Sequence, residues 1–142
     1  MDGLAQHLVW FFPMLWLGMV LAISFLEAPL KFRAPGITVP LGLGIGRIVF
    51  KALNTVETVL AALLVLACLV LAPGTAVWVW LGIAVVVLAV QLVVIRPPLT
   101  RRSNQVLAAG EDLPRSTVHY YYVGFEVVKV VALIGLAIVA AP

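Results

Sequence analysis

The segment at residues 116–140, STVHYYYVGFEVVKVVALIGLAIVA, is a long apolar stretch that nevertheless carries ionisable side chains. It is long enough to cross the ~30 Å hydrocarbon core of a bilayer, which takes about 20 apolar residues in a helix. Its polar members follow one another at intervals of three, four and three residues, on one helical face: His119, Tyr122, Glu126 and Lys129. Because an ionised side chain in hydrocarbon costs at least a few kcal/mol, we expect this face to point into protein.

The composition of the whole chain agrees with a membrane location. Of its 142 residues, 64% are hydrophobic and 11% are charged, whereas soluble domains carry about 25% charged residues. We therefore expect a single transmembrane domain over residues 1–142, with the lipid bilayer as its surroundings. The net charge of +3 comes without a basic run interleaved with aromatic residues, so no nucleic-acid partner is expected.

Three further apolar segments complete the expected fold, an all-α bundle of four transmembrane helices. The helices are expected at about residues 6–28, 46–71, 76–95 and 116–140. Pro29 and Pro97 are expected to end the first and third helices. A short surface helix is expected at residues 100–109, ended by Gly110. The turn at residues 72–75, Ala-Pro-Gly-Thr, predicts that the third helix packs back against the second.

Basic residues gather around two of the three connections, at about residues 29–45 and 96–115. They are Lys31, Arg33, Arg47 and Lys51 near the first connection, and Arg96, Arg101, Arg102 and Arg115 at the other. The positive-inside rule places both connections in the cytoplasm and both termini outside, in a prokaryotic-type plasma membrane. The tryptophans agree, because Trp10 and Trp16 read as interfacial aromatics at the outer end of the first helix.

The two halves of the chain share a spacing. The shift that superposes Glu57 on Glu126 also superposes Pro29-Leu30 on Pro98-Leu99 and Arg33 on Arg102. An even number of helices in each half would make this a repeat of two parallel two-helix units. A chance alignment in so apolar a chain is the alternative, and both readings stay open.

A buried polar cluster is the main candidate site. Glu57 and Glu126 each lie about 15 Å along their helices from the inner end, near the middle of the bilayer, and so can converge. Lys129 is able to pair with Glu126 within the helix or with Glu57 across the bundle. The cytoplasmic mouth of the cluster is expected to hold Asn54, Lys51 and His119. Glu27 and Lys31, four residues apart, form a possible interfacial ion pair.

Other chemistry finds little support in the sequence. Gly42, Gly44 and Gly46 alternate with no strand before them, so we expect close helix packing and not a dinucleotide loop. His7 and His119 lie near opposite interfaces and cannot jointly ligate a haem iron within a monomer. Neither a hydrolytic triad nor an HExxH motif is present, so no catalytic residue, cofactor or metal is expected.

Three functions stay open at this point. The first is a non-enzymatic membrane protein, partner-binding or self-associating, in which the Glu/Lys cluster acts as polar glue between helices. The second is a small proton-coupled transporter or exporter component that uses Glu57 and Glu126, since unpaired carboxyl groups at this depth would be protonated. An enzyme acting on a lipid or a quinone is the third.

Several short motifs follow one another along the chain. They are Trp16-Leu17-Gly18, Ser24-Phe25, Ala28-Pro29, Phe32-Arg33, Arg47 with Phe50, a proline-ended third helix, and His119 at the start of the fourth. In this order they resemble the small four-helix bacterial membrane proteins classed as a domain of unknown function and related to eukaryotic TMEM-type proteins. The resemblance implies a compact four-helix membrane unit with no established biochemical activity. That family has an amide-bearing or apolar residue one or two turns after the histidine, so Glu126 and Lys129 depart from it and no role is transferred to them.

Overall fold

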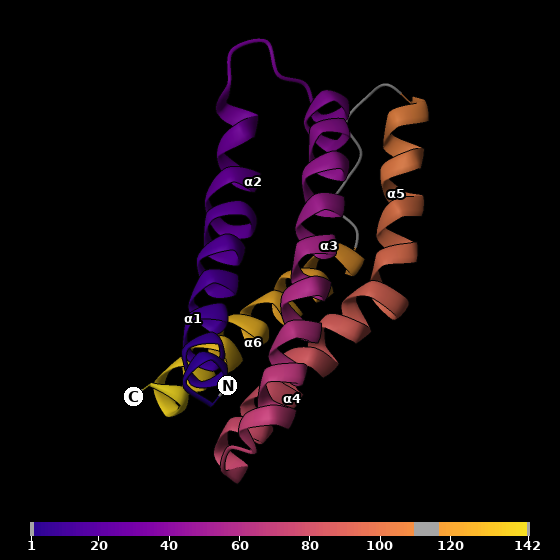
Figure 1. Ribbon diagram of the computed structural model, residues 1–142. Coiled ribbons are helices and arrows are strands. Elements are labelled where there is room, and N and C mark those ends of the chain that lie inside the picture. Colours follow the sequence, from indigo (N-terminus) through magenta and orange to yellow (C-terminus); the bar gives the residue numbers. More distant parts are fainter. Residues whose placement is uncertain (1, 110–116, 142) are drawn as a thin grey trace.

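The structure, a computed structural model, consists of helices joined by short connections (Figure 1). It describes residues 2–109 and 117–141, without the side chains of residues 2, 98, 99, 103, 106, 109 and 117–119. Within this part, four helices are long and apolar enough to cross a membrane: Gly3–Arg33, Val39–Leu71, Thr75–Ile95 and Tyr120–Ala140. The predicted all-α fold, with four helices of the length and composition of membrane spans, is therefore confirmed.

The first helical segment runs without a break to Arg33. It comprises α1 (Asp2–Val20), the π-helical η1 (Leu21–Glu27), α2 (Ala28–Leu30) and the 3-10 turn η2 (Lys31–Arg33). The prediction that Pro29 ends this helix is wrong. The Ala28 N–H bonds to the carbonyl of Ile23, five residues back, so a widened turn immediately precedes Pro29, which has no N–H of its own.

Helix α3 (Val39–Leu71) is longer than a membrane crossing requires. Thr38 caps its start by accepting a hydrogen bond from the Leu41 N–H, and Ala72 ends it in the left-handed conformation. Its 33 residues extend about 50 Å, compared with the ~30 Å thickness of the hydrocarbon core. Much of the connection expected at residues 29–45 is thus helical and continues the bundle beyond the apolar layer.

In the third helical segment, too, the helix continues through a proline that was predicted to end it. It comprises α4 (Thr75–Val90), the π-helical η3 (Gln91–Ile95) and α5 (Arg96–Ala109). The Arg96 N–H bonds to the carbonyl of Gln91, again five residues back, and the helix continues through Pro97. The expected surface helix at residues 100–109 is therefore the end of this longer segment, and Gly110 lies outside the described residues.

Helix α6 (Thr117–Ala140) holds the bundle together, because it packs against both α1 and α4, while α1 also packs against α3. The expected packing of the third span on the second is limited, because α4 lies mainly against α6. Figure 1 shows both termini at one end of the bundle and α2 and α5 at the other. The apolar core includes the fully buried side chains of Leu64, Leu133 and Leu136.

Glycines allow close helix contacts at several points. The Phe32 ring covers Gly42 and the Lys31 ammonium lies over Gly46, so a side chain at either glycine would collide with η2 residues packed on α3. Gly44 has nothing within reach. The prediction of close helix packing is thus confirmed for Gly42 and Gly46 and not for Gly44.

The contact between α4 and α6 depends on Gly135. A Cβ atom there would lie 2.6 Å from the indole of Trp80. We expect Gly135→Ala to destabilise the protein by about 1–3 kcal/mol, because the indole must leave its packed position. Gly124→Ala, the same change on the same helix, meets nothing within 4 Å and should be neutral or slightly stabilising. Unfolding in mixed micelles measures both, and equal effects of the two substitutions would contradict this packing.

Candidate functional site

Lys129 lies at the centre of a polar network inside the bundle. Its Nζ is 2.5 Å from Glu57 Oε2, 2.6 Å from Glu126 Oε1 and 2.9 Å from Gln91 Oε1. An ammonium group has three N–H donors, so these three acceptors satisfy it completely. The side chain of Lys129 is 0% exposed. The interior of the bundle thus contains a fully desolvated cation with a complete set of partners.

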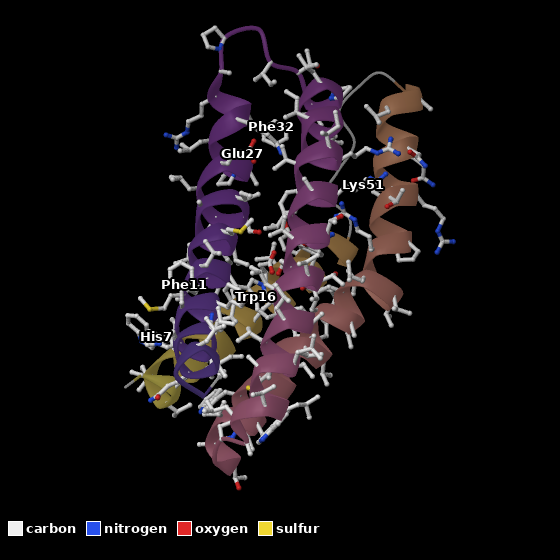
Figure 2. The ribbon with its side chains drawn as sticks, in the orientation of Figure 1. His7, Phe11, Trp16, Glu27, Phe32 and Lys51 are labelled. Atoms are coloured by element: carbon white, nitrogen blue, oxygen red, sulfur yellow. The ribbon has the colours of Figure 1, made fainter. Side chains whose placement is uncertain are left out.

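Further hydrogen bonds connect the two carboxyl groups to the remaining helices. Trp16 Nε1 donates to Glu57 Oε2 at 2.7 Å, and Ser24 Oγ donates to Glu126 Oε2 at 2.8 Å. Gln91 Nε2 lies 3.4 Å from Glu126 Oε1. Figure 2 shows Trp16 between α1 and α3, pointing into the bundle. We call these six residues, Trp16, Ser24, Glu57, Gln91, Glu126 and Lys129, the Lys129 network.

Each of the four helical segments that are long and apolar enough to cross a membrane contributes to the Lys129 network. Trp16 belongs to α1 and Ser24 to η1, Glu57 to α3, Gln91 to η3, and the remaining two residues to α6. The network therefore joins elements that are distant in sequence. Removing one partner from a buried ion pair typically costs about 3–5 kcal/mol, because the other charge is left without compensation.

The network lies near the middle of the expected membrane layer. Counting about 1.5 Å per residue, Glu57 lies about 21 Å from the end of α3 at Leu71, and Lys129 about 16 Å from the end of α6 at Ala140. The middle of a ~30 Å hydrocarbon core is about 15 Å from its edge. Water is scarce at this depth, so the polar groups depend on one another for hydrogen bonds.

Aromatic and cationic side chains lie between the network and the end of the bundle that carries α5. Tyr122, one turn before Glu126, is buried and meets the Phe50 ring edge-on at 6.0 Å. The Phe50 ring in turn contacts the Lys31 ammonium at 5.8 Å and the Arg96 guanidinium at 5.9 Å. These contacts resemble the cation–π geometry that stabilises partly desolvated cations.

The structure brings together only some of the predicted site residues. Glu57, Glu126 and Lys129 converge as expected. Asn54 is buried, and Lys51 is exposed and lies towards the α5 end of the bundle (Figure 2). Within the described part, neither side chain forms a hydrogen bond or ion pair with the network, and only their backbone carbonyls accept bonds from threonines. The side chain of His119 lies outside the described residues.

The possible ion pair between Glu27 and Lys31 is not formed. The Lys31 ammonium lies over the rings of Phe32, at 5.5 Å, and Phe50, in the space that Gly46 leaves open. Two aromatic faces at close range attract this cation. Glu27 Oε2 is buried and has no hydrogen-bond partner among the described residues.

Sequence reasoning missed three members of the network. Trp16 is 0% exposed, so its interpretation as an interfacial aromatic is wrong. A buried indole needs an acceptor for its N–H, and Glu57 supplies it. Gln91 carried a usable signal, because it is the only strongly polar residue of its span. Ser24 carried none, since serine is common in membrane helices, where its hydroxyl often bonds to the backbone.

Access to the network limits the chemistry it can perform. Its charged side chains are 0–2% exposed, so a substrate would have to separate the helices to reach them. Among the described residues, no three His, Cys, Asp or Glu side chains gather in a group that could hold a metal ion. The arrangement is suited to fixing helices and to binding a proton.

The indole hydrogen bond can be tested with two tryptophans of α1. We expect Trp16→Phe to destabilise the protein by about 1–3 kcal/mol, because it leaves a buried acceptor short of one donor. Trp10→Phe is the matched control, since Trp10 is only partly buried and lies outside the network. Denaturant unfolding followed by circular dichroism measures both. A loss of stability at Trp10 as large as that at Trp16 would contradict the assigned contact.

Comparisons with protein-family models, with curated proteins and with solved structures find no match to this chain. No relative therefore assigns a role to Glu57, Glu126 or Lys129. The contacts of the network are therefore the basis for a function: a buried cation has three acceptors from α3, η3 and α6, and Trp16 and Ser24 of the first segment bond to two of these acceptors.

Proposed function

We propose that this chain is a non-enzymatic integral membrane protein in which the Lys129 network acts as polar glue between the four helices. One observation supports this most directly. The Lys129 ammonium has an acceptor for each of its donors, from α3, η3 and α6, and all of these groups are buried. A proton relay would instead need polar groups that reach water, and the charged members of the network do not.

The network gives the bundle specificity more than stability. Replacing a buried ion pair with apolar side chains is often neutral or stabilising, whereas removing one partner is costly. Helices in lipid gain little from apolar contacts alone, because lipid tails are as apolar as leucine. A single arrangement that satisfies Lys129 therefore selects one register of α3, η3 and α6 over its alternatives.

A rigid bundle of this kind is suited to association within the membrane. We propose that its partners are other membrane subunits or further copies of the same chain, held in the lipid bilayer. The outward faces of the helices carry many large exposed apolar side chains, such as Leu66, Leu69, Val86 and Ile138, which suit either lipid or a neighbouring helix. The resemblance to four-helix membrane proteins of unknown function stays a prediction beside this proposal.

The proposed topology places both termini outside and the α5 end in the cytoplasm of a plasma membrane. Both termini lie at the end opposite α2 and α5 (Figure 1). Lys31, Arg33 and Arg96 belong to segments at the α5 end, which supports the cytoplasmic assignment by the positive-inside rule.

The internal repeat also stays a proposal, and two features support it. Each half of the chain forms a packed pair, α1 with α3 and α4 with α6. In each half, a π-helical segment precedes a proline: η1 before Pro29 and η3 before Pro97. The shift that superposes Glu57 on Glu126 nearly superposes these two segments as well.

A proton-coupled transporter or exporter component is the second candidate function. It is favoured by two buried atoms that lack hydrogen-bond partners in the described part, Glu57 Oε1 and the Tyr122 hydroxyl. The Glu57 oxygen is available to bind a proton that enters the network, and the Tyr122 hydroxyl is available as a hydrogen-bonding group along its path. The glue role is the stronger proposal, because the remaining polar atoms of the network are engaged with one another.

The glue role predicts a large effect of removing the central cation. We expect Lys129→Met to destabilise the bundle by about 3–5 kcal/mol, because two buried carboxyl groups lose their partner. Lys51→Met is the matched control and should have little effect, since Lys51 is exposed. Unfolding in mixed micelles and size-exclusion chromatography measure stability and assembly.

Two outcomes would reject the glue role. One is a Lys129→Met protein as stable and as well assembled as the Lys51→Met protein. The other is a proton flux by the parent protein in liposomes that Glu57→Gln and Glu126→Gln abolish while folding and oligomeric state stay intact. That flux would establish the transporter role instead.

The topology predicts which cysteines a membrane-impermeant reagent can reach. In a Cys68→Ala background, we expect a cysteine in place of Arg101, an exposed residue of α5, to be labelled only after the cells are permeabilised. A cysteine in place of Gly3, near the other end, should be labelled in intact cells. Labelling of the position 101 cysteine in intact cells would reverse the proposed orientation.

A further inference from the structure

The formal charges of the Lys129 network do not cancel. Glu57 and Glu126 bring two carboxyl groups and Lys129 brings one ammonium, so the fully ionised network has an excess negative charge. Burying an uncompensated charge in a medium of low dielectric constant is so costly that such a group usually becomes neutral. Two cations on the α5 side of the network, Lys31 and Arg96, lie over the Phe50 ring, and among the described residues neither forms an ion pair with Glu57 or Glu126.

The two carboxyl groups differ in their hydrogen bonds. Glu126 accepts at both oxygens, from Lys129 and Gln91 at Oε1 and from Ser24 at Oε2. Glu57 accepts from Lys129 and Trp16 at Oε2 only, and its Oε1 is buried without a partner. Donors at both oxygens stabilise a carboxylate, whereas a bare oxygen favours the protonated form.

We infer that Glu57 is a proton-binding site, a neutral carboxylic acid with its proton on Oε1, while Glu126 and Lys129 form the ion pair. Binding of the proton changes no other bond. Oε2 becomes the carbonyl oxygen of the acid and still accepts from Trp16 Nε1 and Lys129 Nζ. The network as a whole is then neutral, and each remaining charge has a partner of opposite sign.

Among the described residues, no further cation pairs with the carboxyl groups of the network, which leaves the proton as the source of this neutrality. Besides Glu57, the network consists of Trp16 from α1, Ser24 from η1, Gln91 from η3, and Glu126 and Lys129 from α6. Next to it are Tyr122, whose backbone carbonyl accepts from Gln91, and the buried Asn54, one turn before Glu57 on α3. Of these, only Glu126 and Lys129 carry a charge at neutral pH. The inference does not depend on the glue role, since a transporter would need the same proton.

Infrared spectroscopy and carbon-13 NMR of the full-length protein in lipid vesicles test this inference. At neutral pH we expect one band from a protonated carboxylic acid, shifted in heavy water. With glutamate labelled at its side-chain carboxyl carbon, the Glu57 signal should lie in the range of an acid and the Glu126 signal in that of a carboxylate. Both measurements use the unsubstituted protein, so the result does not require a variant to fold.

Variants then assign the band. Glu57→Asp should change its frequency, whereas Glu27→Gln should leave it unchanged and so excludes the other carboxyl group with a buried bare oxygen. Lys129→Met should about double the band area, because both carboxyl groups then lack a cation. The inference is overturned by the absence of an acid band in the folded parent, by loss of the band in Glu27→Gln, or by an acid-type signal at Glu126.

Discussion

The structure depends on one requirement, that an ammonium group deep in an apolar layer must have an acceptor for every N–H. Lys129 meets it with Glu57, Gln91 and Glu126, of which only Glu126 belongs to the same helix. The other acceptors require α3 and η3 to approach α6 at one depth. Trp16 adds α1 by bonding to the acceptor that α3 supplies. The bonds of Lys129 and of its acceptors therefore link all four segments at one depth.

The π-helical segments η1 and η3 supply further polar partners to this network. Ser24 and Gln91 both lie in π-helical segments, η1 and η3, and both bond to Glu126. A π turn changes the direction of the side chains that it contains and often occurs at functional positions. It also lets the helix continue into Pro29 and Pro97, where a regular helix would lack a donor and clash. The same feature thus places a polar side chain and preserves the span.

The sequence predicts the charged centre of the site well and its periphery poorly. Ionisable residues in an apolar stretch have to find partners inside the protein, so residue spacing alone predicted that Glu126 pairs with Lys129 and that Glu57 lies at the same depth. Trp16 has no such constraint, because an indole suits a membrane interface as well as a buried acceptor. Proline rules failed at Pro29 because they assume a regular helix on both sides. The Glu27–Lys31 pair failed because aromatic faces compete for the ammonium.

A network made neutral by a proton on Glu57 is compatible with both proposed functions, polar glue between helices and proton-coupled transport. Polar glue with an excess buried charge would oppose the packing it is meant to fix, so a proton on Glu57 makes the glue role energetically consistent. The network is also asymmetric along the bundle. Towards the α5 end it meets Tyr122 and Phe50, with the cations that flank the ring, whereas towards the termini it meets the apolar core around Leu64 and Leu133. If protons reach Glu57 from the α5 end alone, the protonation of the network follows the pH on that side of the membrane. Transport would further require a path for the proton through the apolar core.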